Sequence, residues 1–497
     1  MKKIYAIIVA VLAFAAASSC NKFLDMKPTN SLDSEASINS VADAQVALNG
    51  LMRQMLSASF YGRNFLLYGD AKGGDFTVIS NGRGYDGLYT FSHTENSGTY
   101  SGFWSVGYKC IAQINSTLEA ISKVEGESGS YNAIKGQLYT LRGMLYFDLA
   151  RLYGRDYAYD KAALAVPIVL ELNSTARLPR NTVEEVYAQV LKDLSTGATL
   201  LGDSKSRNNG FINYYGNLAI QARVAMHTKQ YATALALCKE IIASGVYKLY
   251  TNAEWAGSWA KQWGSESIIE FAVMDEEADL GASSLGVAMV RSGDPVNARA
   301  TGYFVASDFW LDRMREDASD VRWQVMDEDE LSTDGKVPGR KGSCYKYVGG
   351  LARKGDGKAA ASAVNIKLCR LSEIYLIAAE AAFHSADKAA AADYLKQITK
   401  RSPALAEPTS STVTLDWILN EKSKEFYGEG VRYWDRIRNN QEIEFNDIIA
   451  GGEGELPHPN RPSKINRTFF RCILPIDRDE INATGKDVLV QNPGYSN

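Results

Sequence analysis

The sequence predicts a mainly α-helical protein, a tetratricopeptide-like scaffold of helix pairs that carries long loops and a few short strands. Two stretches, 215–242 and 371–398, have apolar residues at helical spacing on both sides of a short polar break, which is the pattern of two antiparallel helices. Two others, 62–102 and 276–363, are rich in Gly, Asn, Ser, Asp and aromatic residues without a sustained helical period. The strict repeat signature with its tryptophan and proline is absent, so a degenerate array and unrelated helix packing are the alternatives.

The first twenty residues have the order of a bacterial secretory signal. Met1–Lys3 precedes an apolar run, Ile4–Ala17, and Ser18–Cys20 follows it. The run has about 14 residues, whereas a membrane-spanning helix needs about 20. Small residues directly before a cysteine resemble the cleavage site of bacterial lipoproteins, so we expect removal of a signal peptide, residues 1–19, and lipidation of Cys20. Ala17 replaces the usual leucine of that site, and ordinary cleavage near Ala17 is the alternative.

Further helices are expected before the two pairs. Apolar periodicity predicts helices at about 104–121 and 131–152, and another at 183–194 behind the cap-forming residues Asn181 and Thr182. Small alanines where the helices of the 215–242 pair cross allow a close approach. The apolar positions of that pair are Tyr215, Leu218, Ala219, Ala222, Val224, Met226, Tyr231, Ala234, Leu235, Cys238, Ile241 and Ile242.

Composition and charge exclude several classes of function. With 54 Lys plus Arg against 58 Asp plus Glu, the net charge of -4 offers no broad positive field for nucleic acid. The chain has 27 Tyr and 8 Trp but four His without HxH or HExxH spacing, which favours binding surfaces over zinc chemistry. The six cysteines form no CxxC pair, so no disulfide framework is indicated. We expect no resident cofactor and no catalytic metal.

Five motifs follow one another along nearly the whole mature chain. They are Cys20–Asp25 with Pro28; Leu141–Arg142, Tyr146–Phe147, Leu152–Gly154 and Val166–Pro167; Arg370–Ala381; Glu421, Glu425–Phe426, Gly428–Gly430, Arg432, Trp434–Asp435 and Arg438; and Leu474–Ile476, Glu480–Asn482 and Gln491–Tyr495. Their composition and order resemble the SusD/RagB family, the surface nutrient-binding lipoproteins of Bacteroidetes. Lys422 is a departure, because the family usually has arginine at that position.

The resemblance implies both a fold and a function. It implies a SusD-like helical fold, a lipid anchor on the outer face of the outer membrane, and partnership with a SusC-like TonB-dependent transporter. On this basis the protein captures an oligosaccharide or polysaccharide for glycan uptake and breaks no bond, so it is not an enzyme. The alternatives are a peptide-capturing RagB-type lipoprotein, a surface glycosidase, and an assembly protein that docks the transporter without binding ligand.

The expected organisation is one SusD-like body, residues 20–497, behind the signal segment. Residues 20–275 form an N-terminal segment and helical scaffold with the inserted loop 62–102. A loop-rich region follows at about 276–363. C-terminal helices and a tail occupy about 364–497.

The aromatic loops hold the candidate ligand contacts, because sugars bind flat rings flanked by amides, carboxylates or guanidinium groups. Relatives build their glycan site partly from the first loop, so Arg83, Tyr85, Tyr89 and Tyr100 are the first candidates there. Tyr303 and Trp310 are candidates from the later region. Packing beneath the loops is the alternative for these rings, and Trp310 equally suits a helix anchor. The first loop also contains Tyr61, Arg63, Asn81, Asp86, His93 and Asn96.

Two other patterns receive structural interpretations. Trp255, Trp259 and Trp263 recur every four residues and would form one face of a helix, which we assign to packing. The acidic run Asp327–Glu330 with Asp334 lacks the ligand order of an EF-hand. We expect a solvated acidic face there, and bound calcium stays open.

Overall fold

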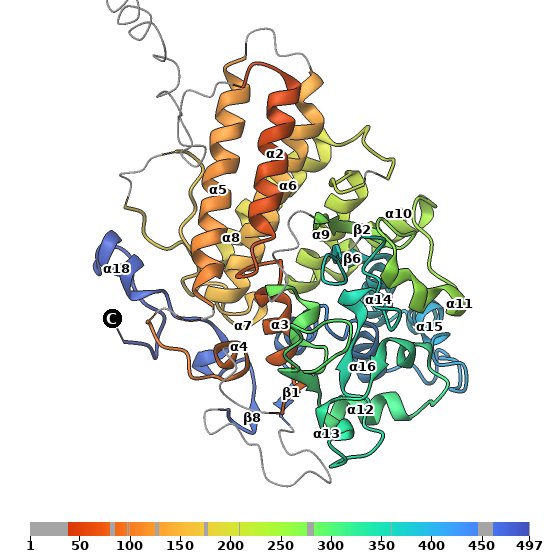
Figure 1. The fold of residues 1–497 in the computed structure, drawn as a ribbon. Coiled ribbons are helices and arrows are strands. Elements are labelled where there is room, and N and C mark those ends of the chain that lie inside the picture. The colour runs from red at the N-terminus through yellow and green to blue at the C-terminus, as the bar shows by residue number, and fades with distance from the viewer. Residues whose placement is uncertain are drawn as a thin grey trace, which may run out of the picture.

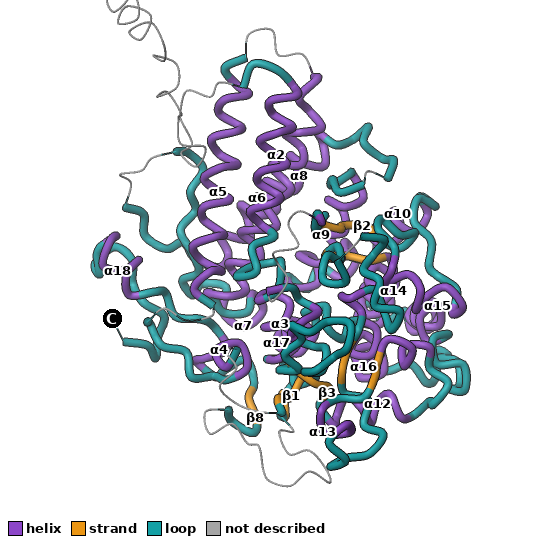
Figure 2. The backbone as a smooth tube through the Cα atoms, viewed as in Figure 1, coloured by secondary structure: helices purple, strands orange, loops and turns teal. Residues whose placement is uncertain are grey.

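Helices dominate the part of the chain that the structure describes, and its strands are short (Figure 2). This computed structural model describes residues 38–79, 85–96, 98, 100–124, 129–172, 177–207, 209–275, 283–358, 360–445 and 461–496. The mainly helical fold class is confirmed. Residues 1–19, Cys20 and Arg83 lie outside the described residues. Within the described ranges, no helix has both the length and the apolar character needed to cross a bilayer.

Long helices α2, α5, α6 and α8 form an upright bundle at one end of the molecule (Figure 1). Contacts run from α2 to α5, from α5 to α6 and from α6 to α8. Helix α8 starts at a capping box, in which the Thr182 hydroxyl accepts the N–H of Glu185 and the Glu185 carboxylate accepts the N–H of Thr182. The three helices predicted before the pairs are confirmed, whereas α2 was not predicted. The bounds are α2 (Val41–Met55), α5 (Ser101–Ser122), α6 (Asn132–Tyr153) and α8 (Val183–Leu200).

Both predicted helix pairs are present and continue the bundle. The first is α9 (Tyr214–His227) with α10 (Tyr231–Ala243), and the second is α14 (Leu371–His384) with α15 (Lys388–Thr399). Contacts follow the order α8, α9, α10, α14 and α15. The pairs therefore stack on one another although more than a hundred residues separate them in sequence.

The turns of the two pairs have the same geometry. The second residue after each first helix has a left-handed φ, 57° at Lys229 and 64° at Ala386. This conformation reverses the chain after a helix and directs the next N–H groups back to its last carbonyls. Accordingly, Gln230 donates to the carbonyl of Ala225 at 2.8 Å, and Asp387 donates to that of Ala382 at 2.9 Å.

Antiparallel two-stranded sheets join segments that are distant in sequence. The β1–β3 pair places Phe76 opposite Ala306, so it brings the two predicted loop regions together. The β2–β6 pair connects the stretch after α10 to the start of α14. The paired strands are β1 (Phe76–Val78) with β3 (Phe304–Ala306), β2 (Ser267–Phe271) with β6 (Ile366–Arg370), β4 (Met326–Asp327) with β5 (Ser343–Cys344), and β7 (Ile443–Glu444) with β8 (Lys464–Ile465).

The two regions predicted as loops also contain short helices. Every residue of α3 is buried, so this helix has no polar face and no amphipathic period to detect. Helix α12 has eight residues, too few to show a sustained period. The remaining helices are α3 (Asn64–Ala71), α4 (Asp86–Tyr89), α7 (Tyr157–Asp160), α11 (Asn252–Trp255), α12 (Asp308–Arg315), α13 (Glu330–Thr333), α16 (Leu415–Glu425), α17 (Arg432–Arg438) and α18 (Arg478–Thr484).

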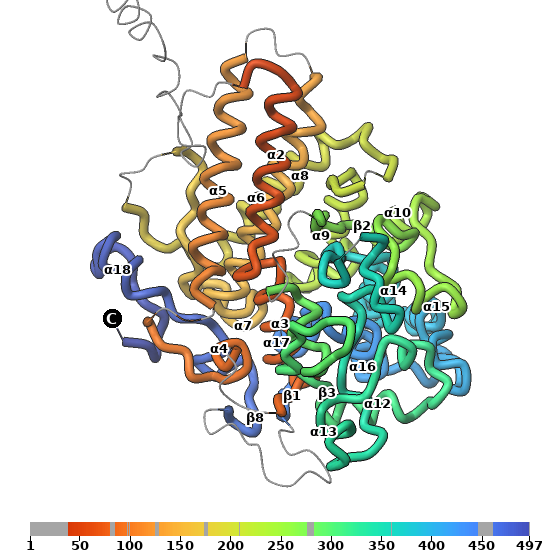
Figure 3. The backbone as a smooth tube through the Cα atoms, viewed as in Figure 1, coloured from red at the N-terminus to blue at the C-terminus, as the bar shows by residue number. Residues whose placement is uncertain are grey.

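The N-terminal and C-terminal parts of the chain are interleaved at α3. This helix packs against α17, and in Figure 3 the red-orange α3 lies against blue C-terminal chain. The Gly430 N–H donates to Asp70 Oδ2 at 2.9 Å. A Cβ atom on Gly69 would lie 2.1 Å from the Gly430 carbonyl oxygen. The two backbones therefore touch without space for a side chain.

Gly69→Ala is expected to lower the free energy of unfolding by about 1–3 kcal/mol, because the added methyl group forces two backbones apart. Urea unfolding of the purified protein measures the loss. Gly257→Ala is the matched control, since no atom lies within 4 Å of a Cβ at Gly257, and it should leave stability unchanged. Equal stability of the two variants would contradict the close approach of α3 and Gly430.

Candidate functional site

The two loop regions meet in a cluster of aromatic rings beside β1 and β3. Tyr85 directly precedes α4, and Tyr303 directly precedes β3. Their ring centroids are 5.1 Å apart. The Phe304 ring lies 4.8 Å from that of Tyr303 and 6.3 Å from that of Tyr89. The structure thus brings Tyr85, Tyr89 and Tyr303 together around Phe304.

Arg63 supplies a cation to this cluster from the segment before α3. Its Nη1 donates to the Tyr85 hydroxyl at 3.2 Å, and its guanidinium carbon lies 5.0 Å from the centre of the Tyr85 ring. Burial lowers the pKa of Arg63 from its usual value. Arg63 is one of several polar residues in the first loop, and no local sequence signal singles it out, because its partner Tyr85 is 22 residues away.

A carboxylate completes the cluster at Asp86. The Tyr303 hydroxyl donates a hydrogen bond to Asp86 Oδ1. Burial raises the pKa of Tyr303, and the Asp86 carboxylate raises it further, so the phenol keeps its proton. Ring surfaces, a guanidinium and a carboxylate thus lie within one small region. Together these groups suit a ligand with apolar faces and a hydroxyl rim.

Tyr85, Tyr89 and Tyr303 differ in their access to solvent. Tyr85 keeps 8% of its surface exposed, whereas Tyr89 and Tyr303 have none. The guanidinium carbon of Arg461 lies 3.6 Å from the centre of the Tyr89 ring and covers it. The expectation of direct ligand contact is therefore corrected for Tyr89 and Tyr303, which pack beneath Tyr85 because β1, β3 and the 461 segment close over them.

Tyr100 lies apart from the cluster, at the start of α5. Its hydroxyl donates to the carbonyl of Thr94 at 2.9 Å and accepts the N–H of Thr94 at 3.1 Å. The ring is 5% exposed and meets the His93 ring edge-on at a centroid distance of 5.0 Å. In this arrangement Tyr100 holds the 92–96 segment against the bundle.

Trp310 is also apart from the cluster, and it anchors α12. It is 1% exposed, its Nε1 donates to the carbonyl of Ser423 at 3.1 Å, and its ring lies 4.2 Å from that of Tyr427. The structure therefore corrects Trp310 as a ligand contact and supports the helix-anchor alternative. The physical reason is the packing of α12 on α16, which covers the indole.

The three regularly spaced tryptophans do not share one helix face. Helix α11 ends at Trp255 and continues as a 3-10 turn, Ala256–Ala260. Trp255 and Trp259 are 0% and 1% exposed, so the packing assignment is confirmed for these two. Trp263 lies beyond the turn and is only half-buried. Its position is a departure from the expected helical pattern.

The acidic run is not a fully solvated face. Asp329 is completely buried, caps α13 by accepting the N–H of Ser332, and forms an ion pair with Arg340. Asp327 pairs with Arg353 at 3.2 Å. The expectation of a solvated face is corrected, because arginines from the following loops turn part of the run inward. Among the described residues, no group of three or more His, Cys, Asp or Glu side chains is placed to hold a metal ion.

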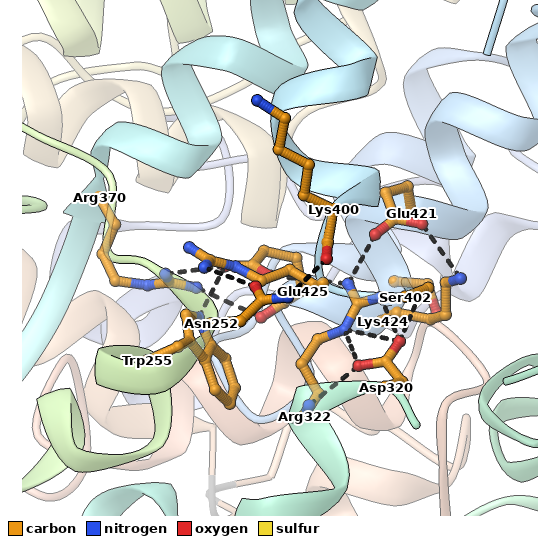
Figure 4. A network of polar contacts seen from close by, with 12 residues as sticks. Asn252, Trp255, Asp320, Arg322, Arg370, Lys400, Ser402, Glu421, Lys424 and Glu425 are labelled. Carbon is orange, nitrogen blue, oxygen red and sulfur yellow. Dashed lines mark hydrogen bonds and ion pairs between the residues drawn. The ribbon is translucent and has the colours of Figure 1, made fainter. Parts of the chain in front are cut away.

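Residues of the family-like late motifs form a buried network of ion pairs (Figure 4). Arg322 donates to Glu421 at 2.7 Å, to Asp320 at 2.6 Å and to Ser402 at 3.0 Å. Farther along, Arg370 donates to Glu425 at 3.0 Å. These side chains are at most 5% exposed. The network therefore joins α16 to the segments before α14 and after α12, and substrate in solvent cannot reach it.

A polar cavity lies between the bundle and α17. It encloses about 70 Å³, and charged side chains from both parts of the fold line it. Ligand sites have volumes of about 300–1,000 Å³, so this cavity is too small for a sugar. The charged lining residues are Asp148, Arg151, Arg223, Glu373, Lys422, Glu429, Asp435 and Arg438.

The architecture matches solved structures of the SusD superfamily. The structure of a SusD superfamily protein from Bacteroides thetaiotaomicron has a TM-score of 0.81 and 29% identity, covering 91% of this chain and 100% of that chain. A structure from Bacteroides vulgatus, provisionally described as a sugar binding protein, has a TM-score of 0.81 and 30% identity, covering 93% and 100%. The fold is therefore that of the SusD superfamily.

Sequence comparison gives the family. A profile described as starch-binding and associating with the outer membrane matches residues 22–224, and the SusD family profile matches residues 257–495. SusD-like protein P2 of Formosa agariphila is 24% identical over 95% of this chain and 96% of its own length. The chain belongs to the SusD/RagB family, which confirms the resemblance that the five motifs indicated.

Proposed function

We propose that this chain is a non-catalytic glycan-binding lipoprotein that captures oligosaccharide or polysaccharide at the outer-membrane surface and passes it to a SusC-like TonB-dependent transporter. The observation that supports it most is the succession of two SusD profiles along nearly the whole chain, the first described as starch-binding and outer-membrane-associated. Cys20 lies just before the first match and would carry the lipid anchor. The structural neighbour described as a sugar binding protein adds support.

In this proposal the glycan contacts Tyr85 and Arg83, with Arg63 and Asp86 at the edge of the same surface. Tyr85 is the ring of the cluster that keeps exposed surface, and Arg83 is two residues before it in sequence. Tyr89 and Tyr303 support the surface from beneath. The guanidinium of Arg63 holds the Tyr85 hydroxyl, so the ring is oriented before ligand arrives, and less conformational entropy is lost on binding.

Tyr85→Ala and Arg83→Ala are each expected to weaken glycan binding about tenfold or more, since loss of a stacking ring or a charged hydrogen bond costs about 1–3 kcal/mol. Isothermal calorimetry of the mature protein against oligosaccharides, with maltoheptaose among them, measures this. Tyr159→Ala is the matched control, because Tyr159 is 42% exposed and outside the cluster, and it should bind as the parent does.

Three other results would contradict the proposal in distinct ways. Binding of extended peptides without binding of any glycan would establish peptide capture of the RagB type. Release of reducing sugar that one Asp or Glu substitution abolishes would establish a glycosidase. Normal glycan affinity in both variants would place the site away from Tyr85.

A further inference from the structure

Trp263, between α11 and β2, has an unfavourable backbone conformation that the surrounding residues hold in place. Its φ is 53°, in the left-handed region that residues with large side chains rarely adopt. Its N–H donates to Glu270 Oε1 at 3.0 Å, and its carbonyl accepts a hydrogen bond from the Arg207 guanidinium. Such a conformation persists only where the surroundings determine it, and it often marks a functional position.

A chain of buried polar groups supports Glu270 in turn. Asn365 Nδ2 donates to Glu270 Oε1 at 2.8 Å, and the Asn365 N–H donates to Asp356 Oδ2 at 2.6 Å. Lys358 closes the chain by donating to Asp356 at 2.6 Å and to Asn365 at 2.7 Å. Asp356, Asn365 and Glu270 are at most 5% exposed. One connected chain of hydrogen bonds through Glu270, Asn365 and Asp356 therefore holds the N–H of Trp263.

The strained backbone at Trp263 does not bring its indole into the core. Trp255 and Trp259, a few residues earlier, are 0% and 1% exposed, whereas Trp263 is half-buried. One edge of its ring rests on Gly210, where a Cβ atom would come within 3.1 Å of the ring. Full burial in the core therefore does not account for the conformation, and the Trp263 side chain keeps part of its surface exposed.

Trp263 lines two hollows. The larger is shallow and wide open to solvent, so its volume of about 600 Å³ belongs to an exposed surface hollow and not to an enclosed pocket. Its rim carries carboxylate, ammonium, amide and hydroxyl groups, and the smaller hollow adds a guanidinium and a second amide. The rim residues with exposed polar groups are Glu254, Lys261, Gln262 and Ser265 in the larger hollow, and Arg207 and Asn209 in the smaller, whereas Asp356 and Glu270 line the hollows from buried positions.

We infer that Trp263 is the platform of a second saccharide-binding site, separate from the surface at Tyr85. The C–H face of a pyranose ring stacks on the indole while its hydroxyl groups bond to the polar rim. Helix α4, which follows Tyr85, and helix α11, which precedes Trp263, lie well apart in Figure 1. The inference rests on the proposed function, because it takes glycan as the ligand, and it adds that one long glycan is held at two places.

The direct test is protection of the indole from oxidation. The full-length mature protein is treated with N-bromosuccinimide, with and without maltoheptaose or xylohexaose, and oxidation at each tryptophan is measured by peptide mass spectrometry. We expect an oligosaccharide that binds to protect Trp263 at least threefold and to leave Trp417 unprotected, since Trp417 is also half-buried but lies in α16 outside the hollow. Protection of Trp263 should persist in Tyr85→Ala.

The matched variants are Trp263→Gly and Trp417→Ala. Glycine accepts the left-handed φ, so Trp263→Gly removes the ring without straining the backbone, and its thermal unfolding should equal that of the parent. We expect about tenfold weaker binding of a long polysaccharide such as amylose by Trp263→Gly, and no change with Trp417→Ala.

The possible failures can be told apart. Glycan binding at Tyr85 with no protection of Trp263, and with normal polysaccharide affinity in Trp263→Gly, overturns the second site and leaves the proposed function intact. Protection of Trp263 by peptides alone also overturns it. Absence of glycan binding anywhere on the chain overturns the proposed function and the second site together.

Discussion

Arg322→Met is expected to lower the free energy of unfolding by about 3–5 kcal/mol, which is the cost of removing one partner from a buried ion pair. Arg322 is 1% exposed and makes hydrogen bonds to Asp320, Glu421 and Ser402. Methionine fills part of the volume but donates no hydrogen bond, so the buried carboxylates of Asp320 and Glu421 lose a cation that binds both. Most of the loss in stability comes from leaving carboxylate charges buried without a cation, and less of it comes from the lost attraction between Arg322 and these carboxylates.

Urea unfolding followed by circular dichroism measures this loss. Arg315→Met is the control, because the Arg315–Asp312 pair is 53% and 67% exposed, and exposed pairs contribute about 0–1 kcal/mol. Arg322→Lys should fall between the two, since lysine keeps the charge but lacks the planar fork that binds two carboxylates. A loss for Arg322→Met no larger than that for Arg315→Met would show that the network does not stabilise the fold.

Glu425→Gln is expected to destabilise the protein less at pH 3 than at pH 6, by about 2 kcal/mol. Burial alone would raise the pKa of Glu425, but Arg370, Arg401 and Arg322 outweigh burial and lower that pKa from 4.5 to about 2. A carboxyl with a lowered folded pKa contributes stability that is complete above 4.5 and is lost as the pH falls toward 2. The wild type therefore loses more than half of this contribution between pH 6 and pH 3, whereas the variant has none to lose.

The free energy of unfolding of Glu425→Gln has to be compared with that of the wild type at each pH. Other buried carboxyls change the stability of both proteins with pH in the opposite direction. Burial raises the pKa of Asp70 to about 8, so its contribution is complete below 3.8 and is lost as the pH rises toward 8. Glu184→Gln is the matched control, since Glu184 forms an exposed pair with Lys161. An effect of Glu425→Gln that is constant between pH 6 and pH 3 would contradict the lowered pKa.

The sequence was informative for most of the long helices, although the amphipathic helix α2 was missed. Helices α5, α6, α8, α9, α10, α14 and α15 all show apolar periodicity, and all were predicted. Helix α3 was missed because it is buried on every side and has no polar face. The tryptophan spacing suggested a continuous helix, but α11 ends at Trp255, and spacing alone does not show where a helix stops.

The sequence predicted which loop regions contribute residues to the candidate site, but not which of their aromatic rings reach solvent. Both loop regions were expected to contribute, and the β1–β3 pair does bring them together. Whether a ring faces solvent depends on which distant segment covers it. Arg461 covers Tyr89 and Ser423 receives the Trp310 N–H, and both come from parts of the chain far from those rings. Arg63 was named among the residues of the first loop but not among the first candidates, since its role depends on a contact with Tyr85, 22 residues away.

The contact between α3 and the Gly430 segment has a consequence for the order of folding. Gly430 and Asp70 are 360 residues apart, and joining chain ends across such a distance has a high entropic cost. The pairs α9–α10 and α14–α15 need closure of only short turns, so we expect them to nucleate first. The N-terminal region then completes its core last. Although one profile matches residues 22–224 by themselves, a chain that stops before α17 leaves the apolar surface of α3 uncovered, so we expect residues 22–224 not to fold by themselves.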